Sequence, residues 1–287
     1  MGIELAPDNK VGLRLASPLI AGSGALGFGD AWPPGMRPEM FGALVTAPFG
    51  LRPQRGQAPP RLAEVPCGYL LATADQNPGY GRVVRDHAAA WARSEVPVIA
   101  ALAGSAPADW ARLAARLEEE TAVAGLELAL PGDVVSSDAS VWVSAVRRAS
   151  TLPLLAKLPA TLAEELAAAC AEAGADALVV GTPPGAVYPV ADGSLVEAPI
   201  GGPAALPFTL RALGAVARLG IGLPLVAGGG IYRTEDARLC LEMGAIALQV
   251  RGLVWSDPAA AARLAADLRP EAGESSYSSR PAAKATE

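Results

Sequence analysis

A run of three glycines carries the most informative candidate ligand site in this sequence. The apolar segment 225–227 leads into Gly228, Gly229 and Gly230, and Thr234 then opens a helix. Glycines in such a turn let a phosphate group approach backbone N–H groups near the start of a helix. The alternative is a tight turn that binds nothing, because glycine clusters alone are weak motifs.

Lys157 is the one charged residue of the apolar segment 154–158. A lysine at the end of such a segment can point into a catalytic mouth, where its charge stabilises a cofactor or an intermediate. In the alternative, its side chain reaches solvent just past the strand. We favour the catalytic position, because burying a lysine without a partner is costly. A second loop, Gly22-Ser23-Gly24, adds a hydroxyl group and two amides.

Other residue types exclude several classes of function. The single histidine, His87, excludes multi-histidine metal sites and argues against a Ser-His-Asp triad. Cys67, Cys170 and Cys240 lie far apart and form no CxxC pair, which favours reduced thiols over a disulfide framework. With 23 Lys and Arg against 29 Asp and Glu, the net charge of −6 argues against a nucleic-acid-binding surface.

The sequence also argues against a membrane protein. Its first 15 residues carry charges where a signal peptide has an apolar run. No stretch of about 18 residues is free of charges and turn formers, as a membrane span requires. We therefore expect a soluble, cytoplasmic protein.

Length and hydrophobic pattern indicate which elements position these residues. The chain has 287 residues, of which 51% are hydrophobic, and a single α/β barrel takes about 250. Eight short apolar segments show no alternation with polar residues, which is typical of parallel strands covered on both faces. Eight is also the number of strands that closes a (β/α)₈ barrel. The predicted strands are 18–21, 43–46, 98–102, 126–130, 154–158, 177–180, 223–227 and 246–250.

Amphipathic segments between these strands predict helices, among them 108–120, 162–173 and 235–243. Thr161 and Thr234 are the expected N-caps of the last two helices. Residues 50–81, rich in Pro, Gly and Arg, predict an irregular insertion over the active face. We expect one barrel domain over residues 1–269 and a disordered tail over residues 270–287, which are small and polar.

The order of short motifs along the chain resembles that of a known family, the class 1 dihydroorotate dehydrogenases, and most closely class 1B. These are FMN-containing barrel enzymes of pyrimidine synthesis, and the resemblance runs from about Val11 to Pro258. The motifs, in family order, are Ser17-Pro18-Leu19-Ile20, Gly22-Ser23-Gly24, Gly27-Phe28-Gly29, Pro60-Arg61 with Glu64, Gln76-Asn77-Pro78-Gly79, Ala103-Gly104-Ser105, Ala173-Gly174-Ala175-Asp176, Gly202-Pro203-Ala204 and Gly229-Gly230-Ile231.

The resemblance implies an FMN site. Arg251 stands where the family has a glycine in its phosphate-binding turn. It could supply a bidentate phosphate contact, or its bulk could fill the turn. The other residues at FMN-contacting positions of the family are Ser23, Lys157, Gly202, Gly229, Gly230 and Gly252.

The departures from the family concern its substrate. Ala47 replaces a lysine that contacts flavin and substrate, and Leu71 and Ala129 replace substrate-binding asparagines. The family's "NT" after the sixth strand has become Gly181-Thr182. The cysteine that serves as catalytic base is also missing, and Asp133 and Ser136 are the nearest possible substitutes. No catalytic residue can therefore be assigned.

Two functions remain open. The first is an FMN-dependent oxidoreductase that acts on a small molecule in an altered substrate pocket. The second is a catalytically silent paralogue that serves as a binding or assembly partner. The resemblance further implies a homodimer and an iron–sulfur electron-transfer subunit. The single histidine and the net charge argue against a metal site and a nucleic-acid partner.

Overall fold

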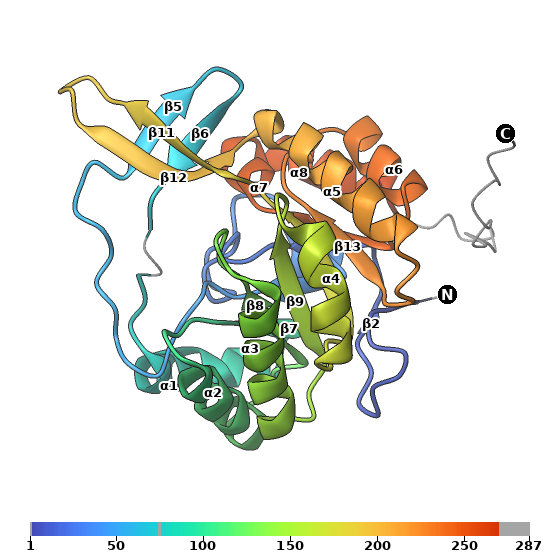
Figure 1. The fold of residues 1–287 in the computed structure, drawn as a ribbon. Helices are drawn as coiled ribbons and strands as arrows, with labels where there is room; N and C mark the ends of the chain where they lie inside the picture. The colour runs from blue at the N-terminus through green and yellow to red at the C-terminus, as the bar shows by residue number, and fades with distance from the viewer. Residues whose placement is uncertain (1, 74–75, 270–287) are drawn as a thin grey trace, which may run out of the picture.

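The computed structural model describes residues 2–73 and 76–269, so the tail 270–287, predicted to be disordered, lies outside the described residues. Eight parallel strands close into a barrel in the order β10-β13-β14-β3-β4-β7-β8-β9 (Figure 1). All eight predicted strands are confirmed, and their bounds lie within two residues of the predicted ones. The barrel strands are β3 (Leu19–Ala21), β4 (Ala43–Val45), β7 (Val98–Leu102), β8 (Gly125–Ala129), β9 (Leu154–Pro159), β10 (Ala177–Thr182), β13 (Leu225–Gly228) and β14 (Ala247–Val250).

Successive residues of each barrel strand belong to different parts of the core. Ile20, Ile99 and Val226 pack together in a cluster of inward-facing side chains. Their neighbours Leu19 and Val98 belong to the larger cluster that includes the buried sides of the helices. Both faces of the strands are therefore apolar, which explains why the sequence shows no alternation.

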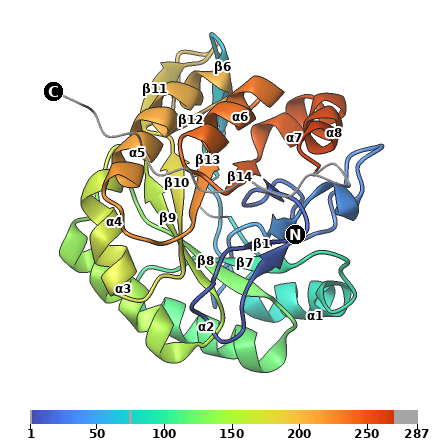
Figure 2. The same ribbon diagram turned by 90° about the vertical axis from the view of Figure 1, so that its right-hand side faces the viewer.

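The helices form a ring around the strands (Figure 2). In α2, the buried residues Trp110, Leu113, Ala114 and Leu117 recur at helical spacing and form one apolar face, as the amphipathic pattern of 108–120 predicts. The segment after β3 differs from the repeating pattern, because within the described residues it holds only a short 3₁₀ helix, Pro38–Met40. The α-helices are α1 (Tyr80–Trp91), α2 (Pro107–Glu120), α3 (Ser136–Ala149), α4 (Ala163–Glu172), α5 (Leu206–Arg218), α6 (Thr234–Glu242), α7 (Gly252–Ser256) and α8 (Pro258–Asp267).

Both predicted threonine caps are wrong. Helix α4 has Leu162 at its N-cap, with no side-chain hydrogen bond, because a backbone turn leads into the helix: the Leu162 N–H donates to the Pro159 carbonyl at 3.0 Å. In α6 the Asp236 carboxylate accepts from the backbone N–H of Arg233 at 3.0 Å. A carboxylate inside the first turn thus satisfies a backbone N–H at the start of the helix, whereas the Thr234 hydroxyl donates to Asp267 at 2.6 Å.

The described part of residues 50–81 reaches the barrel mouth through residues such as Tyr69 and Thr73, as predicted, but it is not irregular throughout. Strands β5 (Leu62–Val65) and β6 (Gly68–Leu71) form an antiparallel hairpin. This hairpin pairs with β12 (Leu195–Gly201), which itself pairs with β11 (Gly185–Pro189). The four strands, here called the roof sheet, project from the barrel (Figure 1).

The opposite end of the barrel is closed by the N-terminal segment. Strands β1 (Ile3–Glu4) and β2 (Arg14–Leu15) form a small antiparallel pair. Leu5, Leu13 and Leu15 are almost fully buried and pack on the inward-facing cluster of the barrel. Burial of each such leucine contributes about 1.5–3 kcal/mol, so the segment is an integral part of the core.

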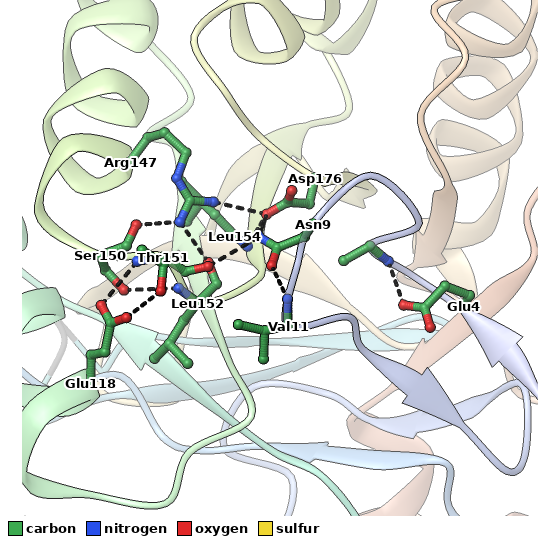
Figure 3. Close-up of polar contacts among 11 residues, drawn as sticks. Glu4, Asn9, Val11, Glu118, Arg147, Ser150, Thr151, Leu152, Leu154 and Asp176 are labelled. Atoms are coloured by element: carbon green, nitrogen blue, oxygen red, sulfur yellow. Dashed lines mark hydrogen bonds and ion pairs between the residues drawn. The ribbon is translucent and has the colours of Figure 1, made fainter.

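A polar network joins the loops at this closed end (Figure 3). One oxygen of Asp176 accepts from Arg147 at 3.0 Å, Asn9 at 3.1 Å and the Leu154 N–H at 2.7 Å. We call this group, together with Glu118 and its partners, the basal network. It connects the N-terminal segment to the loops that precede β9 and β10.

Glu118 holds the loop before β9 from the side of α2. Its carboxylate accepts from the Thr151 backbone N–H at 2.9 Å and from the Thr151 hydroxyl (Figure 3). Burial opposes ionisation, but hydrogen bonds from Thr151 and Ser150 outweigh it and lower the pKa of Glu118. The carboxylate is therefore more stable in its charged form in the folded protein.

Candidate functional site

A cavity of about 470 Å³ lies between the carboxyl ends of the barrel strands and the roof sheet. Pockets of this size are typical of small-molecule and cofactor sites, and in (β/α)₈ barrels the active site lies at this end. Lys157 and the glycine run 228–230, which begins with the last residue of β13, lie at the same end of the barrel. Every predicted cofactor residue lines the cavity: Ser23, Lys157, Gly202, Gly229, Gly230, Arg251 and Gly252.

Lys157 lies within the cavity wall and does not extend to solvent. Its Nζ atom donates to Gln249 Oε1 at 2.8 Å and lies 3.4 Å from Glu127 Oε1. The Gln249 amide in turn donates to the second oxygen of Glu127. The Lys157 side chain is 17% exposed and that of Glu127 only 1%. We call these three residues the mouth triad.

The mouth triad spans the interior of the barrel. Glu127 and Lys157 are on the neighbouring strands β8 and β9, whereas Gln249 is on β14, which stands opposite β8 in the ring. Sequence analysis found only Lys157. A signal for the others was present, because Glu127 and Gln249 are each the single polar residue of an apolar barrel strand.

The glycine run after β13 is required by close backbone packing. Gly230 has φ +78°, and a Cβ atom on it would lie 2.1 Å from the Leu206 backbone nitrogen. A Cβ atom on Gly229, at φ +111°, would lie 2.6 Å from the Gly181 carbonyl oxygen. A tight turn is therefore a sufficient reason for both glycines, and they do not by themselves indicate a ligand.

Two tyrosine hydroxyl groups lie against Gly252. A Cβ atom there would be 2.2 Å from the Tyr232 oxygen and 2.5 Å from that of Tyr69, which belongs to the roof sheet. Burial and the neighbouring Tyr69 raise the pKa of Tyr232, which keeps its phenol protonated. Arg251 lies over the Trp255 ring, 4.7 Å from its centre. The space beside Gly252 is thus taken by tyrosine hydroxyls, neither of which sequence analysis identified.

Thr182 and Ser23 line the cavity, and each carries a hydroxyl group. The Thr182 Oγ1 atom is buried and has no hydrogen-bond partner among the described residues. A buried hydroxyl without a partner is rare and indicates that a hydrogen-bonding group is missing. Ser23 donates to the Thr46 carbonyl at 3.3 Å.

The two candidate substitutes for the catalytic cysteine are not in the cavity. Asp133 is exposed, and the Ser136 hydroxyl donates to the Glu165 carbonyl at 3.3 Å. Both lie after β8, where the chain enters α3, and neither belongs to the cavity lining. Among the cavity-lining residues that the structure describes, the carboxylates are Glu127 and Glu197.

Leu71 and Ala129 do line the cavity. Within residues 2–73 and 76–269, the cavity included, no group of three or more His, Cys, Asp or Glu side chains could hold a metal ion. Over the same residues, no helix combines the length and apolarity needed to span a membrane.

Comparison with known proteins gives concordant results. The family profile described as "Dihydroorotate dehydrogenase" matches residues 7–271. The chain is 36% identical over 274 residues to the dihydroorotate dehydrogenase B (NAD(+)) catalytic subunit of Desulforudis audaxviator, covering 90% of this chain and 89% of the relative. The subunit of the same name from Pelobacter propionicus is 35% identical over 281 residues, covering 91% and 92% of the two chains. That of Citrifermentans bemidjiense is 32% identical over 282 residues, with the same coverage.

Proposed function

This chain belongs to the dihydroorotate dehydrogenase family, and we propose that it is an FMN-dependent oxidoreductase that oxidises a CH–CH donor in an altered substrate pocket. The observation that carries this proposal is the mouth triad, which holds an ammonium group in the wall of a cofactor-sized cavity. Such a group stabilises negative charge that develops on a bound ring during reduction. The open cavity and the retained lysine support an enzyme rather than a silent paralogue.

The residues around the cavity fit FMN by the chemistry of their donors. Lys157 offers a cation, Thr182 an unpartnered hydroxyl, and the turn at Gly252 two phenol groups. Bound FMN would supply a two-electron acceptor for a hydride leaving the substrate. The residues proposed to hold it are Ser23, Lys157, Gly202, Gly229, Gly230, Arg251 and Gly252.

Each part of the site has a separate task in this proposal. Glu127 and Gln249 fix the direction of the Lys157 side chain, since both of its close polar contacts are to them. The roof sheet covers the mouth through Tyr69 and Glu197 and limits the entry of water. Exclusion of water strengthens the electrostatic interactions within the cavity.

The pocket is altered at the positions where the family binds its substrate. Leu71 and Ala129 in the cavity lining offer no side-chain hydrogen bond or charge, and the described lining contains no cysteine. Ala47, next to the lining residue Pro48, offers none either. We therefore propose that dihydroorotate is not its efficient substrate. Because the relatives are named catalytic subunits, we also propose that electrons leave through a partner, an iron–sulfur electron-transfer subunit, and that a homodimer forms. Three free cysteines support a reducing, cytoplasmic setting.

Titration of flavin-free protein with FMN tests the cofactor proposal. We expect quenching of flavin fluorescence with a dissociation constant of tens of micromolar or tighter, which corresponds to roughly 6 kcal/mol or more of binding. The purified protein should also be yellow. A colourless protein that quenches no flavin contradicts the proposal and favours the silent paralogue.

A double variant, Lys157→Met with Glu127→Gln, is the matched test of the mouth triad. The second change removes the carboxylate charge that Lys157→Met would otherwise leave buried and unpaired. We expect the flavin spectrum and affinity to change in this variant and to be unaffected by Lys10→Met, because Lys10 does not line the cavity.

A further inference from the structure

The charges that line the cavity leave no cation for a carboxylate substrate. Among the described lining residues, the cations are Lys157 and Arg251. Lys157 is ion-paired with the buried carboxylate of Glu127 at 3.4 Å. The Arg251 guanidinium lies over Trp255 at 4.7 Å, on the side proposed for the FMN phosphate. Both positive charges are therefore already engaged.

A negative charge faces the cavity from the roof sheet. Glu197 lines the cavity on β12, and within the described residues it forms no ion pair. A substrate carboxylate that entered here would meet a like charge, and juxtaposed like charges suppress binding of the wrong partner. The roof sheet thus selects against anions.

The wall beneath the roof sheet is uncharged. Leu71 ends β6 and Ala129 ends β8, and Ala72, Ile200 and Pro48 belong to the same lining, whose neutral polar side chains include Gln57 and Thr73. A charged group of a substrate would lose its hydration here without gaining an opposite charge, whereas a neutral polar group can still find a hydrogen-bond partner. An uncharged group with a large apolar surface gains from the same contacts.

We infer that the substrate of this site is an uncharged CH–CH donor and not a carboxylate. The inference rests on the proposed function. One carbon of the donor loses a hydride to FMN, the adjacent carbon loses a proton to solvent, and a C=C bond forms between them. The donor is thereby oxidised by two electrons and FMN is reduced by two.

Matched pairs of oxidised ligands that differ by one carboxylate test this inference without turnover. Uracil and orotate are one pair, and 2-cyclohexenone and its 3-carboxylate are a second. Each is titrated into FMN-loaded protein while the flavin absorption band is recorded. We expect the neutral member of at least one pair to bind about tenfold or more tightly than its carboxylate. Equal binding, tighter binding of the carboxylates, or no binding of either neutral compound would overturn the inference.

Glu197→Gln tests the role of the roof-sheet charge. We expect the affinity for the carboxylates to rise roughly 2–5-fold, because the charge that is removed is screened by solvent. The affinity for the neutral compounds should not change. The control is Glu64→Gln, an exposed carboxylate on β5 of the same sheet that does not line the cavity. A preference that is identical in Glu197→Gln and wild type would show that Glu197 does not select.

The outcomes separate this inference from the proposed function. Protein that takes up no FMN overturns both. Protein that binds FMN but prefers the carboxylates overturns the inference alone, and leaves the assignment as a flavin-dependent oxidoreductase intact.

Discussion

Each end of the barrel contains a polar network, but the two networks differ in the groups to which their side chains bond. In the basal network, Asp176 and Arg147 bond to backbone groups of Leu154 and Leu152, so that side chains tie loops together. In the mouth triad, the partners of Lys157 are other side chains, and the nearby Thr182 hydroxyl has none among the described residues. The first arrangement stabilises the fold, and the second holds groups ready for another molecule.

The comparison implies that changes at the two ends have separable effects. Substitutions far apart and without shared partners are usually additive. Changes in the basal network should therefore alter the free energy of unfolding and leave flavin affinity unchanged. Changes at the mouth should alter flavin affinity, and those that leave no buried charge unpaired should have the smaller effect on stability.

The largest expected effect concerns dihydroorotate and the mouth. FMN-loaded protein mixed anaerobically with dihydroorotate should keep its oxidised flavin band for far longer than seconds. A missing general base alone costs about 10²–10⁴ in rate, and the apolar residues Ala47, Leu71 and Ala129 add to that loss. Bleaching within seconds would mean that the mouth contains a base we have not identified.

The next effect concerns the basal network. Asp176→Ala should lower the free energy of unfolding in urea by about 3 kcal/mol, because Arg147 loses its carboxylate partner and the Leu154 N–H loses its acceptor. FMN affinity should not change. Asp133→Ala, at an exposed position, is the control and should cost less than about 0.5 kcal/mol. A loss of FMN affinity in Asp176→Ala would break the separation between the two ends.

A smaller effect distinguishes the two roles of Arg251. If it contacts phosphate, Arg251→Ala should weaken FMN binding by roughly tenfold and leave riboflavin binding unchanged. The exposed Arg238→Ala on α6 serves as the control. Tighter FMN binding in Arg251→Ala would instead mean that the side chain obstructs the turn.

The smallest effect is a pH dependence at the closed end. The pKa of Glu118 is lowered in the folded protein relative to its ordinary value of 4.5. The contribution of ionised Glu118 to the free energy of unfolding is therefore fully present above pH 4.5. It is lost as the pH falls through the pKa of the folded protein. Glu118→Gln should reduce stability near neutral pH by less than about 1 kcal/mol, since solvent screens the site. The difference from wild type should disappear at low pH, and a difference that persists there would contradict the assignment.

The barrel could be predicted because its strands are local features of the sequence. Segments such as 98–102 are apolar throughout, and the bounds of β7 agree with the prediction. The roof sheet could not be predicted in the same way, because β6 pairs with β12, whose residues lie far along the chain. A strand whose partner is distant and whose own pattern is short carries little local signal.

In the candidate site, too, local features could be predicted and contacts between distant strands could not. Lys157 was identified because a lysine in an apolar strand is unusual in itself. Its ion-pair partner Glu127 and the amide of Gln249 could be placed only once the ring order set β8 opposite β14. The threonine caps failed for a related reason, since a backbone turn leads into α4 and the Asp236 carboxylate, inside the first turn of α6, accepts from the Arg233 N–H.

The roof sheet has a consequence for recombination between related genes. One hairpin contributes Ala63 and Leu70 to its small core, and the other contributes Val196 and Ala198. Each hairpin is encoded within a different loop of the barrel, so a crossover that exchanges only one of them pairs two mismatched halves. Chimeras with relatives should fold only when both hairpins come from the same parent, and the specificity of the mouth should then be inherited as a unit.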